Sequence, residues 1–577
     1  MNRNAITIRR LFDQQCLKRP TTEKWLGVSK FSTQPSGKVA DRYGKYLVIS
    51  SLALGGALYY SSLDPRTQRK LRGTFDGFRR FFRTVWTGSL TAIDYKWNLW
   101  GLKEDDEVYN KAIAGCHERA ADRVLATLLR NGGLYIKMGQ AVSAAGMANM
   151  VPKEFATKLQ VLQDQALVMR PDELDDLFLE DFGAAPEDLF SSLNRTPIAA
   201  ASLAQVFRAT TKDGMDVAVK CQYLDLRDRY DGDIRTVEMV FNVLHWLFPQ
   251  FMGHWIFGEV KGTLAMELDF VNEGRNSEKC ARDLSHLPFL YVPKVLWQLT
   301  SDRVLTTEFI DHAAKITEVD KIRKMGLSVA DVNKNFLTIF GEQVFRSGFV
   351  HADPHPGNIF IRPDKSGHAQ IVLLDHGLYE TIPEDVRISI CHIFKATVLA
   401  DHTEMQLYSD KIGMPDYKLF ASILVGRPIG QGKKVLLGLK KEFSKADMEA
   451  FRAEMEGMVD KIQATVKAMP KSLFLVMRNM NLVRAICVVH GNPHDRYTMF
   501  ARLAAQAVMD DTGVRTPSLK NSAAAISERL HFEWKLLMHY VYGRMFLFIV
   551  KILTVLGVGP FSSGFGPPGN FGKPGEI

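Results

Sequence analysis

The sequence predicts an α+β protein of two lobes, preceded by a helical extension and one N-terminal transmembrane helix. Three features of the 577 residues carry this prediction: a β-hairpin pattern that contains Lys220, a second hairpin pattern between Asn358 and Asp375, and long stretches of helical periodicity around both. Hydrophobic residues make up 46% of the chain and charged residues 24%, which supports a large buried core. Disordered, collagen-like and coiled-coil chains are therefore excluded.

The first 45 residues hold most of the excess positive charge. They contain ten Lys and Arg against three Asp and Glu, whereas the whole chain has a net charge of +9. The rest of the chain carries no basic module that could follow a phosphate backbone, so we expect no nucleic-acid partner. A basic, acid-poor start with Ser and Thr at residues 31–36 is typical of a mitochondrial transit peptide. The alternative is a solvated cytosolic tail.

An uncharged run follows at residues 46–63. As a helix its 18 residues would span about 27 Å, close to the hydrocarbon core of a thin bilayer. Tyr46, Tyr59 and Tyr60 suit a membrane interface. We therefore expect a single transmembrane helix here; a buried helix is the alternative, because glycines and serines weaken the hydropathy of the run.

Residues 64–165 are predicted to form the helical extension. Apolar residues recur at helical spacing through residues 111–142, with a break at Gly132-Gly133. Lys137 and Gln140 lie three positions apart, so they share one face of the helix that resumes after the break. A K-x-G-Q sequence is weak evidence on its own, and a solvated helix face is the plain alternative.

Residues 166–310 are predicted to form the first lobe. Two β-rich runs, Ala204–Thr211 and Asp216–Gln222, flank Lys212-Asp213-Gly214 and predict a hairpin. The second run contains Val-Ala-Val followed by Lys220. A lysine that closes an apolar strand, with a small-residue loop before the partner strand, is the arrangement with which kinase-like enzymes hold the α- and β-phosphates of a nucleotide.

Residues 311–530 are predicted to form the second lobe. Residues 351–358, HADPHPGN, place Asp353 five positions before Asn358, which is the spacing of a kinase catalytic loop. In such a loop the aspartate receives or orients a proton on the attacking oxygen.

A hairpin pattern follows this loop. Its strands, Ile359–Arg362 and Gln370–Leu374, end in Asp375-His376-Gly377, so the hairpin brings Asn358 and Asp375 together. Carboxylate and amide oxygens are ligands that Mg²⁺ prefers. The sequence therefore predicts ATP and Mg²⁺ as cofactors, with the metal on Asn358 and Asp375.

Two other interpretations of these motifs compete. A zinc or iron cluster could use the imidazoles and a carboxylate of His351, Asp353, His355 and His376. That cluster leaves Asn358 and Lys220 unexplained. Asp181-Phe182-Gly183 and Ala185-Pro186-Glu187 also spell kinase motifs, but they precede Lys220 and leave no room for an activation loop. We expect a helix end and a loop there.

A glutamate on a helix after Lys220 is expected to pair with it. Glu267 is the predicted partner among Glu267, Glu273 and Glu278, because it lies beside the apolar stripe of Leu264, Leu268 and Val271. Farther on, Val304–Ile310 is a predicted strand that leads into the hinge between the lobes. We place Glu308, within this strand, among the nucleotide-binding residues.

Taken together, these motifs resemble the UbiB (aarF-domain) family of atypical kinases over about residues 105–510. The residues in and around the motifs are most similar to those of a mitochondrial animal member. The motifs occur in order as K-x-G-Q at 137–140, AAAS at 199–202, VAVK, ELDFVNEGRN at 267–276, HADPHPGN and DHG. The resemblance implies a bilobal protein-kinase-like fold with the helical extension over the active site. It also implies ATPase activity in preference to protein phosphorylation and, for better-studied members, a role in coenzyme Q synthesis at the inner mitochondrial membrane.

The resemblance also implies roles for particular residues. Lys137 and Gln140 match the signature motif that faces the nucleotide, and Ala199, Ala200, Ala201 and Ser202 match the replacement for the glycine loop. Alanine raises the steric cost of a close backbone approach, so this loop should hold phosphates differently. His376 replaces the D-F-G phenylalanine and Ala352 replaces the H-R-D arginine.

The acceptor and the chain's end are predicted from short segments. Only seven residues separate Asp375 from Pro383, which leaves no long activation segment and disfavours large protein substrates. Residues 531–577 are predicted to form an amphipathic helix and a disordered Gly/Pro tail. In the helix Arg544 and Lys551 share one face, which favours an interfacial or partner-binding amphipathic helix over a second membrane span; core packing is the alternative.

We therefore expect an ATP-dependent, kinase-like ATPase or small-molecule or lipid kinase of the mitochondrial membrane, with Lys220, Glu267 and Asp353 as catalytic residues. Its expected partners are ATP and ADP, a membrane lipid or lipid-like small molecule, and mitochondrial membrane proteins. The alternatives are a nucleotide-binding scaffold without catalysis, a small-molecule phosphotransferase and a protein serine/threonine kinase.

Overall fold

The computed structural model divides the chain into two compact units, Met1–Thr74 and Phe75–Ile577. It describes residues 58–102, 106–147, 152–164, 171–200, 203–224, 226–247, 264–425, 469–511 and 530–538, with a few single positions beside these ranges. The predicted transit peptide at residues 1–45 lies outside the described residues. So do much of the predicted span at 46–63 and most of the predicted helix and tail at 531–577.

One helix in the described part of the chain is long and apolar enough to cross a membrane, at Ser472–Val489, and 56% of it is buried inside the protein. It belongs to α19 (Lys471–Val489), whose Leu473, Val476 and Val483 pack in the core of the second lobe. A core helix of a soluble domain meets the same criteria of length and composition. The predicted N-terminal span stays a prediction.

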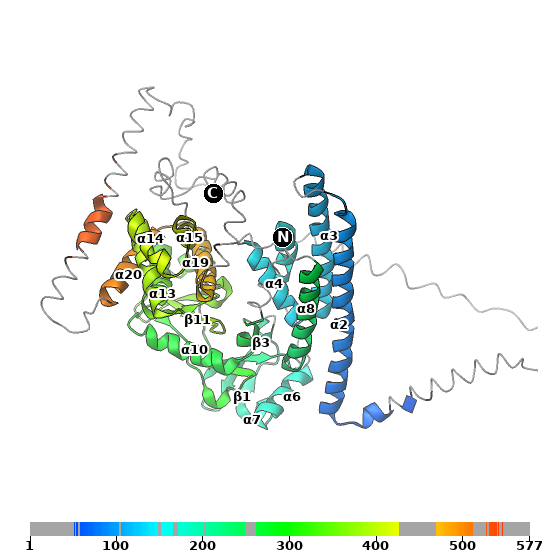
Figure 1. Ribbon diagram of the computed structural model, residues 1–577. Coiled ribbons are helices and arrows are strands. Elements are labelled where there is room, and N and C mark those ends of the chain that lie inside the picture. The colour runs from blue at the N-terminus through cyan, green and yellow to red at the C-terminus, as the bar shows by residue number, and fades with distance from the viewer. Residues whose placement is uncertain are drawn as a thin grey trace, which may run out of the picture. The chain divides into compact units, whose positions relative to one another are not determined.

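Among the residues that the structure describes, the extension contains α2 (Pro65–Asn98), α3 (Glu107–Asn131), α4 (Leu134–Met147) and α5 (Lys153–Leu159). The predicted break is confirmed, because α3 ends before Gly132 and Gly133, both of which have positive φ. In the second unit α2 lies alongside α3 and α8 (Leu226–Leu247) (Figure 1). Two further helices, α6 (Pro171–Phe182) and α7 (Pro186–Leu189), lead into the first lobe, and Asp181-Phe182-Gly183 is a helix end, as predicted.

The first lobe is a five-stranded antiparallel sheet with strand order β1-β3-β4-β6 and β2 beside β3. Its strands are β1 (Phe190–Leu193), β2 (Ala199–Ala200), β3 (Ala204–Thr211), β4 (Asp216–Gln222) and β6 (Val304–Glu308). The observed bounds of β3 and β4 are those predicted from the sequence. Gly214, at a φ of 82°, closes the turn between them. The sheet shares one hydrophobic cluster with the extension, which includes Leu134, Leu162, Phe178, Phe207 and Val219.

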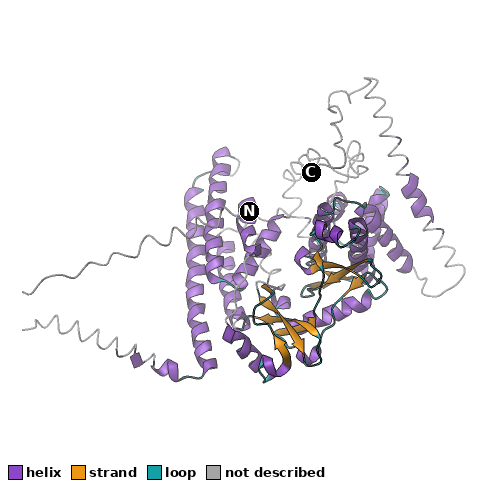
Figure 2. Ribbon diagram, turned by 180° about the vertical axis from the view of Figure 1, so that it is seen from behind, coloured by secondary structure: helices purple, strands orange, loops and turns teal. Residues whose placement is uncertain are grey.

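The chain crosses into the second lobe between Glu308 and β7 (Ala314–Lys315), as the predicted hinge requires. This lobe has a four-stranded sheet of β5 (Leu290–Tyr291), β10 (Ala369–Leu373), β9 (Ile359–Pro363) and β7, and a two-stranded sheet of β8 (Phe349–His351) and β11 (Tyr379–Thr381). Figure 2 shows the strands of the two lobes as separate groups. The other helices in the described part of the lobe are α11 (Val319–Lys324), α12 (Val329–Glu342), α13 (Glu384–Val398), α14 (His402–Lys411), α15 (Tyr417–Val425), α19 and α20 (Arg496–Asp511).

Candidate active site

The hairpin of β9 and β10 places Asn358 and Asp375 at the same end of a sheet. Asn358 closes a short 3-10 turn, Pro356–Asn358, directly before β9 begins. Ile359 is paired with Leu373, and the backbone N–H of Leu374 donates to the Asn358 carbonyl at 3.0 Å. Asp375 is the next residue, so the sequence prediction that the hairpin brings these two side chains together agrees with the backbone register.

Lys220 connects the two lobes from β4. Its Nζ donates to Glu273 Oε1 at 2.7 Å and Oε2 at 2.8 Å, and to Asp375 Oδ2 at 3.3 Å. Glu273 lies on α10 (Phe270–Asp283) and its side chain is 2% exposed. One ammonium group is thus shared by a carboxylate of the first lobe and a carboxylate of the second.

The predicted partner of Lys220, Glu267, is wrong. Its Oε2 instead lies 2.8 Å from Lys137 Nζ. The prediction assumed one continuous helix through residues 264–271, whereas the chain turns at Leu268-Asp269 and Asp269 caps α10 by accepting from the Asn272 N–H. Because α10 is a new helix that begins at Phe270, the apolar stripe before the turn cannot predict which side chains of α10 face Lys220. Glu273 is the one that does.

The charges in this cluster shift one another's pKa. Burial raises the pKa of Glu273 to about 7, and the attraction of Lys220 opposes this rise only in part. For Lys220, burial disfavours the charged form, but the carboxylates of Asp375 and Glu273 outweigh it and raise the lysine's pKa. For Asp375, burial is outweighed by the Lys220 charge and by the Gly377 N–H, which donates at 3.0 Å, so its pKa is lowered well below the usual range.

Asp353 forms an ion pair that the sequence did not reveal. Arg478 Nη2, from α19, lies 3.0 Å from Asp353 Oδ2. The next residue, Asn479, donates its side-chain N–H to the backbone carbonyl of His351 at 2.6 Å. Two consecutive residues of α19 therefore hold the loop that carries Asp353. The local signal was two arginines and two asparagines in the middle of a largely apolar helix.

His376 is a neutral packing residue rather than a metal ligand. Its Nε2 lies 3.2 Å from the Leu373 carbonyl and its Nδ1 lies 3.0 Å from the Tyr379 hydroxyl. Burial lowers its pKa to about 3, so Nε2 carries the hydrogen that the carbonyl accepts. No group of three or more His, Cys, Asp or Glu that could hold a metal ion occurs in the described part of the chain. The zinc or iron interpretation therefore finds no support there.

The K-x-G-Q motif lies on α4, and its two polar residues make different contacts. Burial disfavours the charged form of Lys137, but Glu267 and then Asp353 outweigh this effect and raise the pKa of Lys137. Gln140 instead donates its amide N–H to the Leu162 carbonyl at 2.8 Å, which holds α4 to the turn Gln160–Asp164. The structure therefore places the Lys137 side chain in the charged cluster and gives the Gln140 amide a backbone partner within the extension.

The other predicted nucleotide-binding residues lie in or beside the first-lobe sheet. Ala199 and Ala200 form β2, are exposed, and pair with β3. Ala201 and Ser202 lie outside the described residues. At the hinge, the Glu308 carboxylate accepts from the Tyr291 hydroxyl at 2.6 Å and from the Lys294 N–H at 3.1 Å, so its side chain is used to hold the connection between the lobes.

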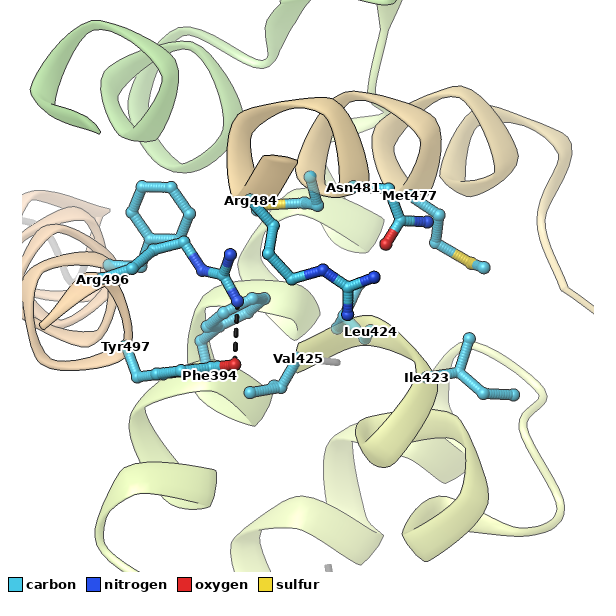
Figure 3. A pocket seen from close by; sticks show the side chains of 11 residues that line it. Phe394, Ile423, Leu424, Val425, Met477, Asn481, Arg484, Arg496 and Tyr497 are labelled. Atoms are coloured by element: carbon cyan, nitrogen blue, oxygen red, sulfur yellow. Dashed lines mark hydrogen bonds between the residues drawn. The ribbon is translucent and has the colours of Figure 1, made fainter. Parts of the chain in front are cut away.

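The oxygen donors at the hairpin end fit a divalent cation. Among the described residues the Asn358 side chain has no hydrogen-bond partner, and Asp375 presents a carboxylate, a donor set suited to Mg²⁺. A separate small cavity of the second lobe, between α13, α15, α19 and α20, is lined by Asn481, Arg484, Arg496, Tyr497 and apolar side chains (Figure 3). The volume of this cavity is about 10 Å³, which is enough for about one water molecule and too small for a nucleotide.

A strand lysine paired to a helix glutamate, an aspartate loop and a hairpin that ends in Asp-x-Gly together define a kinase-like protein. Residues 161–409 match the family model described as the ABC1 atypical kinase-like domain. The chain belongs to this ABC1/AarF family of atypical kinases, which confirms the predicted family.

Three curated relatives illustrate the similarity. A probable serine/threonine-protein kinase, abkD, of Dictyostelium discoideum is 39% identical over 83% of this chain and 67% of its own length. A putative ABC1 protein of Arabidopsis thaliana is 32% identical over 82% of this chain and 91% of its own length. The AarF domain-containing protein kinase 1 of Mus musculus is 34% identical over 76% and 81%. Among solved structures, a Mycobacterium tuberculosis protein in complex with erythromycin is 20% identical over 69% of this chain and 98% of that chain, with a TM-score of 0.42.

Proposed function

We propose that this protein binds Mg-ATP between its lobes and transfers the γ-phosphoryl group to water or to a small, lipid-like acceptor. The observation that carries the proposal is the position of Lys220, held between Glu273 and Asp375 across the two lobes. An ammonium group fixed in this way can hold the α- and β-phosphates of a nucleotide. Asn358 and Asp375 would hold Mg²⁺, which when bound neutralises charge on the phosphates.

Asp353 is the proposed orienting group for the attacking oxygen. Its carboxylate lies in the loop before Asn358, and Arg478 fixes one of its oxygens. The other oxygen is then the one that can accept a hydrogen bond from a nucleophile. A positioned carboxylate of this kind contributes by orientation more than by proton uptake in phosphoryl transfer.

Two features favour a small acceptor over a protein substrate. The chain after Asp375-His376-Gly377 runs directly into β11, which pairs with β8 beside the catalytic loop, and α13 begins at Glu384. That segment offers no long platform for a peptide. In addition, the ion pair of Lys137 and Glu267 brings the extension next to Asp353, whose charge acts on both residues.

The cellular location is part of the proposal. Residues 1–45 have the composition of a mitochondrial transit peptide and residues 46–63 that of a membrane span, which supports a place in a mitochondrial membrane, the inner one. A lipid-like acceptor, coenzyme Q or lipid metabolism and membrane-protein partners would fit that place. Import into isolated mitochondria tests it: the full chain should become protease-protected and carbonate-resistant, and a chain without residues 1–63 should remain outside.

Phosphate release by the purified full-length chain tests the chemistry. Asp375→Asn removes the charge that faces Lys220 and the metal, so turnover should fall at least about a hundredfold, or about 3 kcal/mol of transition-state stabilisation. Asp320→Asn, whose side chain is 91% exposed, is the matched control and should keep parental turnover. Equal turnover in Asp375→Asn and the parent contradicts the proposal. Tight Mg-ATP binding without phosphate release or label transfer would instead identify the protein as a nucleotide-binding scaffold.

A further inference from the structure

Helix α2 carries an exposed aromatic stripe on the side that faces away from the protein. The stripe consists of Phe75, Phe78, Phe82, Trp86, Leu90, Ile93 and Trp97, which are spaced three or four residues apart. At about 100° per residue these positions fall within about 120° of the helix circumference. The four side chains from Phe75 to Trp86 are 61–70% exposed, and Trp97 and the following Trp100 are 83% and 85% exposed.

The opposite face of α2 is polar and is the one that packs on the protein. Arg80 Nε donates to Asp233 Oδ1 of α8 at 2.9 Å, and both side chains are less than a tenth exposed. Thr87 shares a hydrogen bond of 2.7 Å with Thr127 of α3, and Asp94 accepts from two arginines of α3. Figure 1 shows α2 at the edge of the helical layer, beside α3 and α8. The packed side of α2 therefore joins polar contacts with small residues such as Ala92, whereas its large aromatic side chains are on the exposed side.

We infer that this aromatic stripe rests on an anionic lipid surface. A contiguous exposed apolar patch marks a site of interaction, and Trp and Phe are common where a helix lies in the membrane interface. Helix α2 has eight Lys and Arg against two Asp. Arg80 and Asp94 are both turned inward to partners on α8 and α3, which leaves seven basic residues against one acidic residue. Exposed basic side chains, among them Arg79 at 66%, lie beside the stripe and suit acidic headgroups.

The same charges disfavour a second copy of this chain as the occupant. Two identical stripes placed face to face would bring two strongly positive helices together, and like charges across an interface oppose association. An acidic bilayer satisfies both the apolar side chains and the charge. The inference is independent of the nucleotide chemistry, and it adds a lipid contact on α2 to the proposed membrane association.

Tryptophan fluorescence of the full-length chain in vesicles tests the inference. The probes are vesicles of brominated phosphatidylcholine alone and of the same lipid mixed with phosphatidylglycerol, because bromine quenches only tryptophans that enter the lipid. We expect quenching in the parent, stronger with phosphatidylglycerol and weaker at high salt. The variant W86F/W97F/W100F keeps the apolar stripe but should lose most of this quenching. W297F, which changes a half-buried tryptophan of the first lobe, should keep it.

A second variant separates lipid contact from other causes. F78S/F82S/W86S should release the stripe, so that the quenching of Trp97 and Trp100 is lost while thermal unfolding and ATP turnover stay parental. The control L179S/L407S/V488S alters side chains of similar exposure on other helices and should keep the quenching. Unchanged quenching in the stripe variant overturns the inference. A second result also overturns it: the parent shows no lipid quenching and is a dimer by light scattering, whereas the stripe variant is a monomer. The stripe would then be a contact between two copies of the chain.

Discussion

Asp353 and Arg478 form an ion pair of 3.0 Å that joins the catalytic loop to α19 across 125 residues of sequence. Both side chains are partly buried, at 22% and 29% exposure, so solvent screens the pair only in part. The arginine fixes the carboxylate in one orientation, while the adjacent Asn479 holds the loop through the His351 carbonyl. Orientation of Asp353 should therefore depend on α19.

Replacing Arg478 tests that dependence. Arg478→Ala should lower kcat for phosphate release about tenfold, or about 1.4 kcal/mol, because the Asp353 carboxylate loses its orienting partner. KM for ATP should stay unchanged, since Arg478 does not contact the predicted phosphate site. Arg478→Lys should recover part of the rate. Arg323→Ala, at an exposed arginine of α11, serves as control. An unchanged or faster kcat in Arg478→Ala would mean that the pair restrains Asp353 rather than orienting it.

The pH dependence of turnover should report on Glu273. Burial places its pKa at about 7, so the side chain gains a proton as the pH falls from about 8 to 6 and loses its attraction for Lys220. Turnover should therefore fall on the acidic side with a midpoint near that value. In Glu273→Gln the rate should be roughly tenfold lower at neutral pH and this inflection should disappear. An inflection that persists in the variant would assign it to another group.

The contribution of Glu273 to folding stability should fall as the pH rises, whereas turnover should rise. The pKa of Glu273 is raised from the ordinary 4.5, so its contribution to stability is complete below pH 4.5 and is lost as the pH rises through about 7. Urea unfolding of the parent and of Glu273→Gln at several pH values measures this contribution as the difference between the two profiles. We expect the parent to lose stability relative to the variant between those pH values. A parallel pair of profiles would contradict the raised pKa.

The residues that the sequence located correctly are those whose partners follow from local geometry. The Lys212-Asp213-Gly214 turn fixes the β3–β4 hairpin and so places Lys220, and the register of the β9–β10 hairpin places Asn358 beside Asp375. Glu273 was missed because Asp269 caps a new helix, α10, whose side chains do not continue the apolar stripe of the preceding helix. Arg478 carries no local pattern toward Asp353, because only the packing of α19 in the second-lobe core brings them together.

Gly139 tests how tightly α4 packs. A Cβ at this position would lie 2.3 Å from Leu162 Cδ1 and 2.7 Å from Leu128 Cδ1. Both leucines belong to the cluster that joins the extension to the first lobe. Gly139→Ala should therefore destabilise the protein by about 1–3 kcal/mol despite the better helix propensity of alanine. Gly115→Ala in α3 meets only the end of the flexible Arg119 side chain and should be neutral or stabilising. Thermal unfolding of both variants measures the difference.

Lys137 and Glu267 should depend on each other more strongly than a surface pair does. Their side chains are 22% and 12% exposed, so Lys137→Met leaves a carboxylate largely buried without its partner and should cost about 2 kcal/mol. Glu267→Gln in the same chain should recover much of this loss, which a double-mutant cycle by urea unfolding measures as a coupling of about 1–2 kcal/mol. The matched control is the exposed pair of Lys158 and Asp122, at 2.7 Å, whose coupling should be clearly the weaker of the two. Equal coupling in the two cycles would show that the extension does not depend on this ion pair to stay beside the catalytic loop.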